Sequence, residues 1–273
     1  MEDIPPHSYG SVIETTARIV TWNVWGRYGP WAEREAVIIA TLRAAEPDVV
    51  VLVESWAKGE DSQPRRLADP LGLPYHAYSG VRAQEDENAL SGVAVLSRWP
   101  IRRESALSFG CARVHYAELA GPRGAIQVYG LVMDAWWFDE SHARQSAVRD
   151  LLTHVAAGQD DRTPLILCGD FNADPDSDEI RMITGRTAAP VPGLSFNDAW
   201  EMAGPPEPGH TWSNDNPWAT QLLWPNRRID YVFSAAPRRG GAGHARRAAL
   251  LGTSASAGVR PSDHYAVQAD LRY

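Results

Sequence analysis

Short, almost continuous apolar runs recur along this chain of 273 residues. Residues 18–24, 48–53 and 164–168 are typical of strands, and the last two show little polar–apolar alternation. Such runs indicate strands covered on both faces, because a half-exposed strand alternates. Apolar residues at helical spacing lie between the first two runs, over residues 32–45, and Pro47 punctuates the end of that helix. We therefore predict a strand–helix–strand crossover and an α/β fold.

The same pattern continues to the C-terminus with shorter pieces. We predict strands over residues 91–96, 126–133, 228–233 and 265–271, and a helix over 141–155 with Ser141 as its N-cap. The segments 57–88, 173–195, 202–226 and 235–262 are predicted to be long loops, which are usually functional or mobile. No repeat or linker divides the chain. We predict one domain over residues 18–273, preceded by an extension over 1–17.

Charge and composition exclude several classes of protein. The net charge is −8, so the chain lacks the overall positive field of nonspecific DNA-binding proteins. Residues 225–273 nevertheless carry a net +5, either on a solvated surface or on a rim facing phosphate. The two cysteines, Cys111 and Cys168, form no zinc or disulfide pattern. The first ten residues do not resemble a signal peptide, and no apolar stretch approaches about 18 residues, so we expect a cytoplasmic protein without a membrane span.

Polar side chains follow or interrupt the predicted strands. They are Asn23, Glu54, Asp170, Asn172, Asp230, Asp263 and His264. A single carboxylate after a strand is usually a turn former or a helix cap. Several of them, mixed with two asparagines and a histidine, are harder to explain as caps. In α/β sheets, ligands bind in the crevice beyond the strand ends, and carboxylate and amide oxygens suit a hard cation such as Mg²⁺.

Six segments in this order resemble motifs of the endonuclease/exonuclease/phosphatase superfamily, which includes pancreatic-type deoxyribonucleases, abasic-site endonucleases, sphingomyelinases and inositol polyphosphate 5-phosphatases. They are Thr-Trp-Asn-Val-Trp (21–25), Val-Leu-Val-Glu (51–54), Ser-Gly-Val-Ala-Val-Leu-Ser-Arg (91–98), Gly-Asp-Phe-Asn (169–172), Arg-Ile-Asp-Tyr-Val-Phe (228–233) and Ser-Asp-His (262–264). The resemblance spans nearly the whole chain. It implies a four-layer α/β sandwich, in which two packed mixed β-sheets are flanked by helices.

The resemblance also implies a divalent-metal site and a water nucleophile. Asn23 and Glu54 would hold Mg²⁺ or Mn²⁺, with Glu54 as the principal carboxylate, and Asp263 would join or support the metal shell. Asp170 would orient or deprotonate the attacking water. The metal would bind a phosphoryl oxygen and neutralise charge on the leaving group.

Other residues are implied to contact the phosphate. Asn172 would donate to a phosphoryl oxygen in the transition state, and His264 would contact the phosphate or the water. Asp230 would fix the tautomer and ring angle of His264. Arg228, in the motif that contains Asp230, is assigned to substrate binding.

One segment departs from the family pattern. Many members carry a histidine at the end of the strand that corresponds to residues 126–133, where this chain has Met133 or Asp134. Asp134 is either an additional residue that binds metal or substrate, or a residue that ends the strand in a turn. Trp136 and Trp137 follow it, and they either form a stacking platform for a base or an apolar leaving group or simply pack loops.

The sequence therefore predicts a metal-dependent hydrolase of a phosphate ester, most directly a phosphodiesterase. The acidic charge and the aromatic loops favour a small or single-stranded phosphate compound, and nucleic acid is possible but not favoured. The alternatives are a DNA endonuclease or exonuclease and a non-catalytic scaffold of the same fold. A glycosidase with paired carboxylates would leave the histidine and the two asparagines unexplained. The sequence indicates no protein partner.

Overall fold

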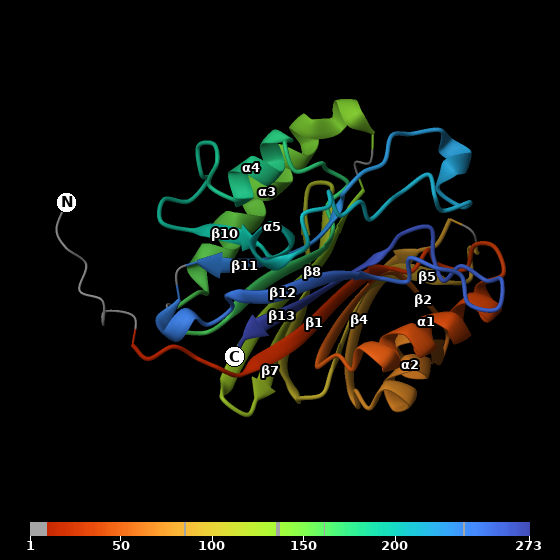
Figure 1. Cartoon of the computed structure of the whole chain (residues 1–273), viewed down its shortest axis with the longest axis horizontal. Helices are drawn as coiled ribbons and strands as arrows, with labels where there is room; N and C mark the ends of the chain where they lie inside the picture. Colours follow the sequence, from red (N-terminus) through yellow and green to blue (C-terminus); the bar gives the residue numbers. More distant parts are fainter. Residues whose placement is uncertain (1–9, 85, 135–136, 161, 237) are drawn as a thin grey trace.

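Two β-sheets stack face to face at the centre of the protein (Figure 1). The computed structural model describes residues 10–84, 86–134, 137–160, 162–236 and 238–273, so Trp136 lies outside the described residues. In spatial order, the first sheet consists of β12 (Ala245–Leu251), β13 (Ala266–Arg272), β1 (Thr16–Asn23), β2 (Val49–Lys58), β5 (Leu90–Ser97) and β4 (Tyr75–Arg82), and β3 (Asp61–Ser62) pairs with β2.

The second sheet has the spatial order β10 (Ser195–Asp198), β11 (Asp230–Ala236), β9 (Leu165–Asp170), β8 (Gly124–Met133), β7 (Ala112–Gly121) and β6 (Ile101–Phe109). Both sheets are mixed. β1 runs parallel to β2 and β8 runs parallel to β9, whereas the remaining pairs are antiparallel. Each parallel pair is joined by a helix, because parallel strands require a crossover.

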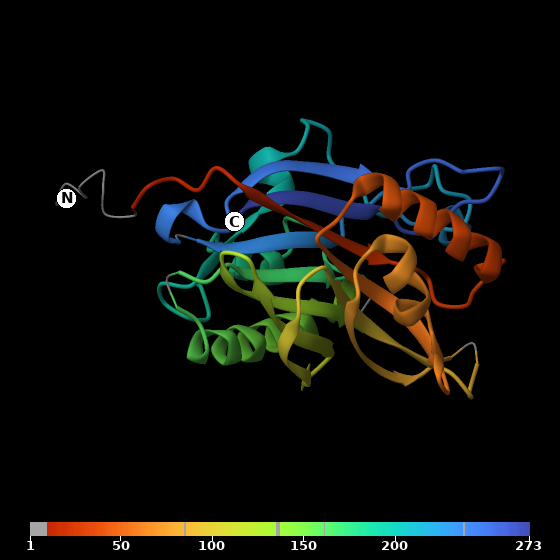
Figure 2. The ribbon, with the colours of Figure 1, turned by 90° about the horizontal axis from the view of Figure 1, so that it is seen from below.

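Helices cover the outer faces of the two sheets (Figure 2). α1 (Trp31–Ala45) and α2 (Gln63–Leu71) pack on the first sheet, and α3 (Ser141–Ala157) and α4 (Asp178–Ile183) pack on the second. The short α5 (Ala199–Ala203) contacts β11 and β12. Short 3₁₀ turns span Phe138–Glu140, Thr220–Leu222 and Arg239–Gly241. Among the described residues, no helix is long and apolar enough to cross a membrane.

Three apolar clusters correspond to the spaces between the four layers. Val51, Val95 and Val128 belong to the cluster between the sheets, which explains why strands such as β2 are apolar on both faces. The other clusters join the first sheet to α1 and α2, and the second sheet to α3 and α4. The predicted four-layer α/β sandwich is therefore confirmed.

The structure corrects parts of the local prediction. Segment 57–88 contains β3, α2 and β4 rather than a single loop, and 235–262 contains β12. The sequence does not reveal α2, because the helix is short and Pro70 lies inside it, whereas Pro64 lies in the first turn, where proline is tolerated. β4 and β12 lie at the edges of their sheet, so they do not need the continuous apolar runs of central strands. Ser141 is not the N-cap of α3, because it is the first helical residue and its Oγ donates to Glu179.

Candidate active site

The predicted site residues meet at one edge of the stacked sheets. Asn23 ends β1, Asp170 ends β9, and Asp230 begins the antiparallel β11 beside Asp170. His264 lies just before β13. Both crossovers place the carboxyl ends of their parallel strands at this edge, which is where ligands bind in α/β folds.

Glu54 reaches the site through a backbone irregularity. The sequence places it at a strand end, but β2 continues to Lys58 and its pairing with β5 shifts register between Leu52 and Ser55. Glu54 has φ 54°, the left-handed region that non-glycine residues rarely adopt. A β-bulge, the usual cause of such a register shift, turns one side chain out of the alternating pattern of the strand.

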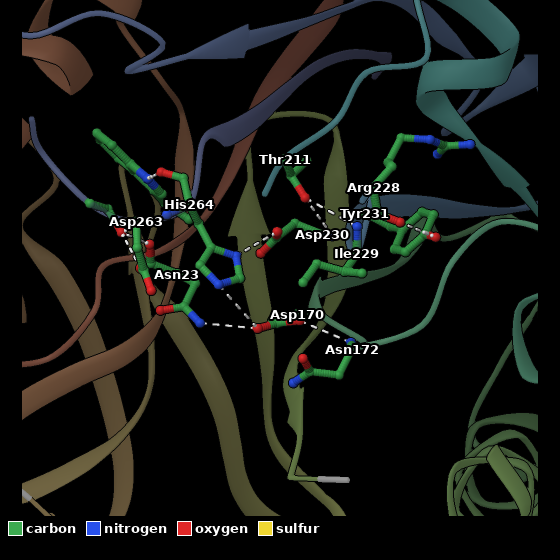
Figure 3. A network of polar contacts seen from close by, with 12 residues as sticks. Asn23, Asp170, Asn172, Thr211, Arg228, Ile229, Asp230, Tyr231, Asp263 and His264 are labelled. Carbon is green, nitrogen blue, oxygen red and sulfur yellow. Dashed lines mark hydrogen bonds and ion pairs between the residues drawn. The ribbon is translucent and has the colours of Figure 1, made fainter. Parts of the chain in front are cut away.

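Hydrogen bonds and one longer ion pair connect these side chains into one network, most of which Figure 3 shows. Asn23 Nδ2 donates to Glu54 Oε1 and to Asp170 Oδ2, at 3.0 Å in both cases. His264 Nδ1 lies 2.9 Å from Asp230 Oδ2, and His264 Nε2 lies 4.0 Å from Asp170 Oδ2. Asp170 and His264 therefore face one another across a narrow gap.

Two further residues, which the sequence does not single out as site residues, hold this network in place. Thr211 Oγ1 accepts from the backbone N–H groups of Ile229 and Asp230, at 3.1 and 3.2 Å. Ser262 Oγ donates to the carbonyl of Asn23 at 2.7 Å and accepts from the backbone N–H of His264 at 3.2 Å. Ser262 could have been suspected from its place in the Ser-Asp-His motif. Thr211 carries no comparable signal.

Asn172 is fixed from two directions. It has φ 50°, its backbone N–H donates to Asp170 Oδ1 at 2.9 Å, and its Nδ2 donates to the carbonyl of Met133 at 2.8 Å. The carbonyl of Asn172 accepts from Arg227 Nη2 at 3.1 Å. Since an amide nitrogen has two hydrogens, one N–H of Asn172 is left for a ligand.

Met133 and Asp134 occupy the place where many family members have a histidine, and the structure shows where each side chain lies. The side chain of Met133 is fully buried in the core beneath α3, and only its carbonyl serves the site through Asn172. Asp134 lines the cavity described below and forms an ion pair with Arg113. Burial raises the pKa of Asp134, and Arg113 opposes that shift. Asp134 is therefore placed to meet a ligand, whereas the side chain of Met133 is not.

Arg228 does not point into the site. Its side chain is buried, forms an ion pair with Asp198, and lies 3.5 Å from Glu201 Oε1. Its guanidinium carbon lies 5.0 Å from the ring centroid of Tyr231. Arg228 is not among the residues that line the cavity, and Figure 3 shows it directed away from His264. This placement does not support the predicted substrate contact.

Burial and neighbouring carboxylates shift the pKa values of the site residues. Burial and the neighbouring Asp230 raise the pKa of Asp170 to about 7. Burial also raises the pKa of Asp263. For His264, burial lowers the pKa, but Asp230 and Asp263 outweigh it and raise the pKa well above its usual value. These shifts favour a protonated His264 and make the surrounding carboxylates costly to keep ionised without a further cation.

Two separate groups of side chains could hold that cation. Asp170, Asp230 and His264 offer ligand atoms within 4.8 Å of one another. However, His264 Nδ1 already faces Asp230 at 2.9 Å, and an imidazole that keeps both protons has no lone pair for a metal. Asn23, Glu54 and Asp263 offer oxygens instead, the donors that Mg²⁺ and Mn²⁺ prefer. This second set is chemically the better fit, and Glu54 and Asp263 both line the cavity.

A cavity of about 580 Å³ opens over the network. Glu54, Asp170, Asn172, Asp263 and His264 line it, as do the aromatic residues Trp25, Tyr28, Trp212 and Trp224 and the cations Arg82 and Arg113. Trp137 is half-exposed and packs edge-on against Trp224, with ring centroids 5.7 Å apart. The volume is typical of a site for a small molecule or one segment of a polymer.

The sequence of this chain matches a known family, and its fold matches known structures. The model of the Endonuclease/Exonuclease/phosphatase family matches residues 20–264. Truncated Caenorhabditis elegans TDP2 superimposes with a TM-score of 0.73 at 16% identity, covering 96% of this chain and 100% of that one. D. rerio TDP2 complexed with single strand DNA product gives 0.74 at 16% identity, covering 95% and 100%. An endonuclease/exonuclease/phosphatase from Beutenbergia cavernae gives 0.69 at 24% identity, covering 94% and 72%. No curated protein matches the chain.

Proposed function

This chain belongs to the endonuclease/exonuclease/phosphatase family, and from that premise we propose that it is a divalent-metal-dependent phosphodiesterase that activates water for in-line attack on phosphorus. One observation carries the proposal. Asp170 and the His264–Asp230 pair, which lie far apart in the sequence, face each other with 4.0 Å between His264 Nε2 and Asp170 Oδ2. An acid–base pair at this separation suits a reaction that needs both a proton acceptor and a donor to phosphate.

Asp170 is the proposed acceptor of the water proton. Asn23 Nδ2 and the backbone N–H of Asn172 each donate to one of its oxygens, and these bonds fix the carboxylate plane. Burial and Asp230 raise the pKa of this carboxyl to about 7, and a carboxylate with a raised pKa is a stronger base than an ordinary one.

His264 and Asn172 are the proposed donors to the phosphoryl oxygens. Asp230 Oδ2 accepts from His264 Nδ1, which leaves the Nε2–H free to face the phosphate. The Asn172 N–H that does not bind Met133 is available to a second oxygen. Mg²⁺ or Mn²⁺, held by Asn23, Glu54 and Asp263, would supply positive charge at the phosphate as negative charge develops.

The cavity favours a small phosphodiester or the end of a single strand over a continuous duplex. Its aromatic residues offer faces for stacking, and its volume is that of a small-molecule site. A nuclease acting on DNA is the second candidate. The observation that favours it is the superposition on D. rerio TDP2, whose structure was determined in complex with a single strand DNA product.

Hydrolysis of bis-p-nitrophenyl phosphate with Mg²⁺ or Mn²⁺ tests the proposal. We expect turnover that EDTA abolishes and that His264→Ala lowers to background. We also expect Glu54→Gln to raise the Mg²⁺ concentration needed for half-maximal rate, and Asp170→Asn to lower mainly kcat. Metal binding without turnover of any ester would instead support the non-catalytic scaffold. A panel of plasmid DNA, single-stranded DNA, RNA, sphingomyelin, phosphoinositides and nucleotide pyrophosphates would then identify the substrate.

A further inference from the structure

Arg34, in the first turn of α1, is a buried cation that binds backbone rather than a carboxylate. Its side chain is 1% exposed. Its guanidinium donates to five carbonyls at distances of 2.8 to 3.1 Å, which belong to Val24, Trp25, Gly26, Tyr28 and Pro261. An arginine has five N–H donors, and here all three nitrogens are engaged with backbone acceptors.

These carbonyls belong to the two segments that adjoin the predicted metal ligands. Residues 24–28 come directly after Asn23, and Pro261 lies two residues before Asp263. Segment 24–28 is also tied to Glu54, because the N–H of Gly26 donates to the carbonyl of Glu54 at 3.1 Å. One guanidinium therefore joins the backbone around all three predicted ligands.

The first of these segments has an unusual conformation that needs such support. Trp25 has φ 56° and Gly26 has φ 42°, both in the left-handed region. A non-glycine residue keeps this conformation only where surrounding contacts hold it there. The guanidinium carbon of Arg34 lies 4.9 Å from the ring centroid of Trp25, so the arginine contacts both the backbone and the side chain of that residue.

We propose that Arg34 is a positioning residue that sets the spacing of Asn23, Glu54 and Asp263 and thereby the affinity of the site for a divalent cation. The proposal rests on the proposed function only in its choice of metal ligands. It assigns Arg34 no contact with substrate.

The charge of Arg34 and its hydrogen bonds act on a bound cation in opposite directions. Burial lowers the pKa of Arg34 to about 10, while Asp263 and Glu54 oppose that shift, so the group stays charged at neutral pH. As a charge near Glu54 and Asp263, it repels a second cation, and its removal should tighten metal binding. If its hydrogen bonds hold the site together, its removal takes a donor from five backbone carbonyls and should weaken metal binding. The sign of the change separates the two roles.

The test is Mn²⁺ binding to the purified full-length protein without substrate, measured by electron paramagnetic resonance, for wild type, Arg34→Met and Arg34→Lys. We expect Arg34→Met to weaken Mn²⁺ binding by about 10-fold or more, the effect typical of losing a residue that orients metal ligands. Arg34→Lys keeps a charge but has fewer donors, so we expect partial rescue. At saturating Mn²⁺, kcat of both variants should stay within about 3-fold of wild type, because Arg34 contacts no reacting group.

Arg144→Met is the matched control. Arg144 is an equally buried arginine, with its Nε 2.5 Å from Glu179 Oε1 between α3 and α4. We expect this variant to lose thermal stability but to keep the Mn²⁺ affinity of wild type. If Arg34→Met does not fold, Arg34→Lys decides by the same measurement.

Unchanged or tighter Mn²⁺ binding in the Arg34 variants would contradict the proposal that Arg34 positions the metal ligands. Equal weakening in Arg144→Met would also overturn it, because the effect would then reflect general destabilisation. A wild type that binds Mn²⁺ but hydrolyses no ester would overturn the proposed function alone, and the binding comparison would still decide the role of Arg34. A wild type that binds no Mn²⁺ would overturn both.

Discussion

Replacing Asp230 by asparagine removes one charge from the centre of the site while keeping its shape. Both Asp230 and His264 are buried, and Asp230 Oδ2 lies 2.9 Å from His264 Nδ1. The amide oxygen of the variant can still accept from Nδ1, so the ring stays in place. The imidazolium, however, loses its nearest counter-charge.

The size of the effect follows from this geometry. At 2.9 Å and an effective dielectric constant of about 20, the attraction is about 6 kcal/mol. The cost of keeping both charges out of water offsets part of it, and removing one partner of a buried pair costs about 3 kcal/mol at the lower end of the measured range. If the transition state loses that amount, kcat should fall about 100-fold. Asp230 is not among the proposed metal ligands, so the Mg²⁺ requirement should not change.

Steady-state hydrolysis of bis-p-nitrophenyl phosphate over a Mg²⁺ titration measures both quantities. Asp198→Asn is the control, since it removes a buried carboxylate that pairs with Arg228 outside the cavity. We expect that variant to unfold at a lower temperature and to keep kcat within about 3-fold of wild type. A kcat for Asp230→Asn close to wild type would refute the reasoning. A strongly raised Mg²⁺ requirement would show instead that Asp230 binds the metal.

Three further predictions concern other parts of the site and the fold. Asn172→Asp tolerates the left-handed φ but removes the amide donors, so we expect kcat to fall by about 100-fold or more. The circular dichroism spectrum should match that of wild type, and an unchanged kcat would contradict the proposed phosphate contact. Gly169→Ala would place a Cβ 1.9 Å from the carbonyl oxygen of Leu131, so urea unfolding should show that the free energy of unfolding falls by about 3 kcal/mol. An unchanged free energy of unfolding would show that the backbone can move to make room. Burial lowers the pKa of His115 below that of the unfolded chain, so the unfolded state binds the proton more readily and the contribution of His115 to stability is lost as the pH falls below about 6.5. Urea unfolding of wild type and His115→Gln at pH 5, 6 and 7.5 should therefore show a weaker loss toward acid in the variant, and parallel curves would exclude this effect.

Much of the architecture can be read from the chain, because strand burial leaves a direct compositional trace. Central strands such as β2 and β9 are apolar on both faces, and this made them recognisable. Edge strands such as β4 and the proline-containing α2 lack that trace and were missed. The motif at residues 169–172 was recognised by its resemblance to a family pattern, and the structure adds that Gly169 leaves no room for a Cβ beside Leu131.

What the sequence determined by itself is which polar residues follow or interrupt the apolar runs, and the crossovers then required several of them to share one edge. What only the tertiary structure decided is which of the charged and polar groups face the cavity. Arg228 and Arg34 are both arginines close to site motifs, yet one is paired with Asp198 and the other binds five carbonyls. Met133 serves the site through its carbonyl, which composition cannot reveal. The physical reason is that a buried charge or amide is stable only where partners from distant segments satisfy it, and those partners meet only when the sheets have stacked.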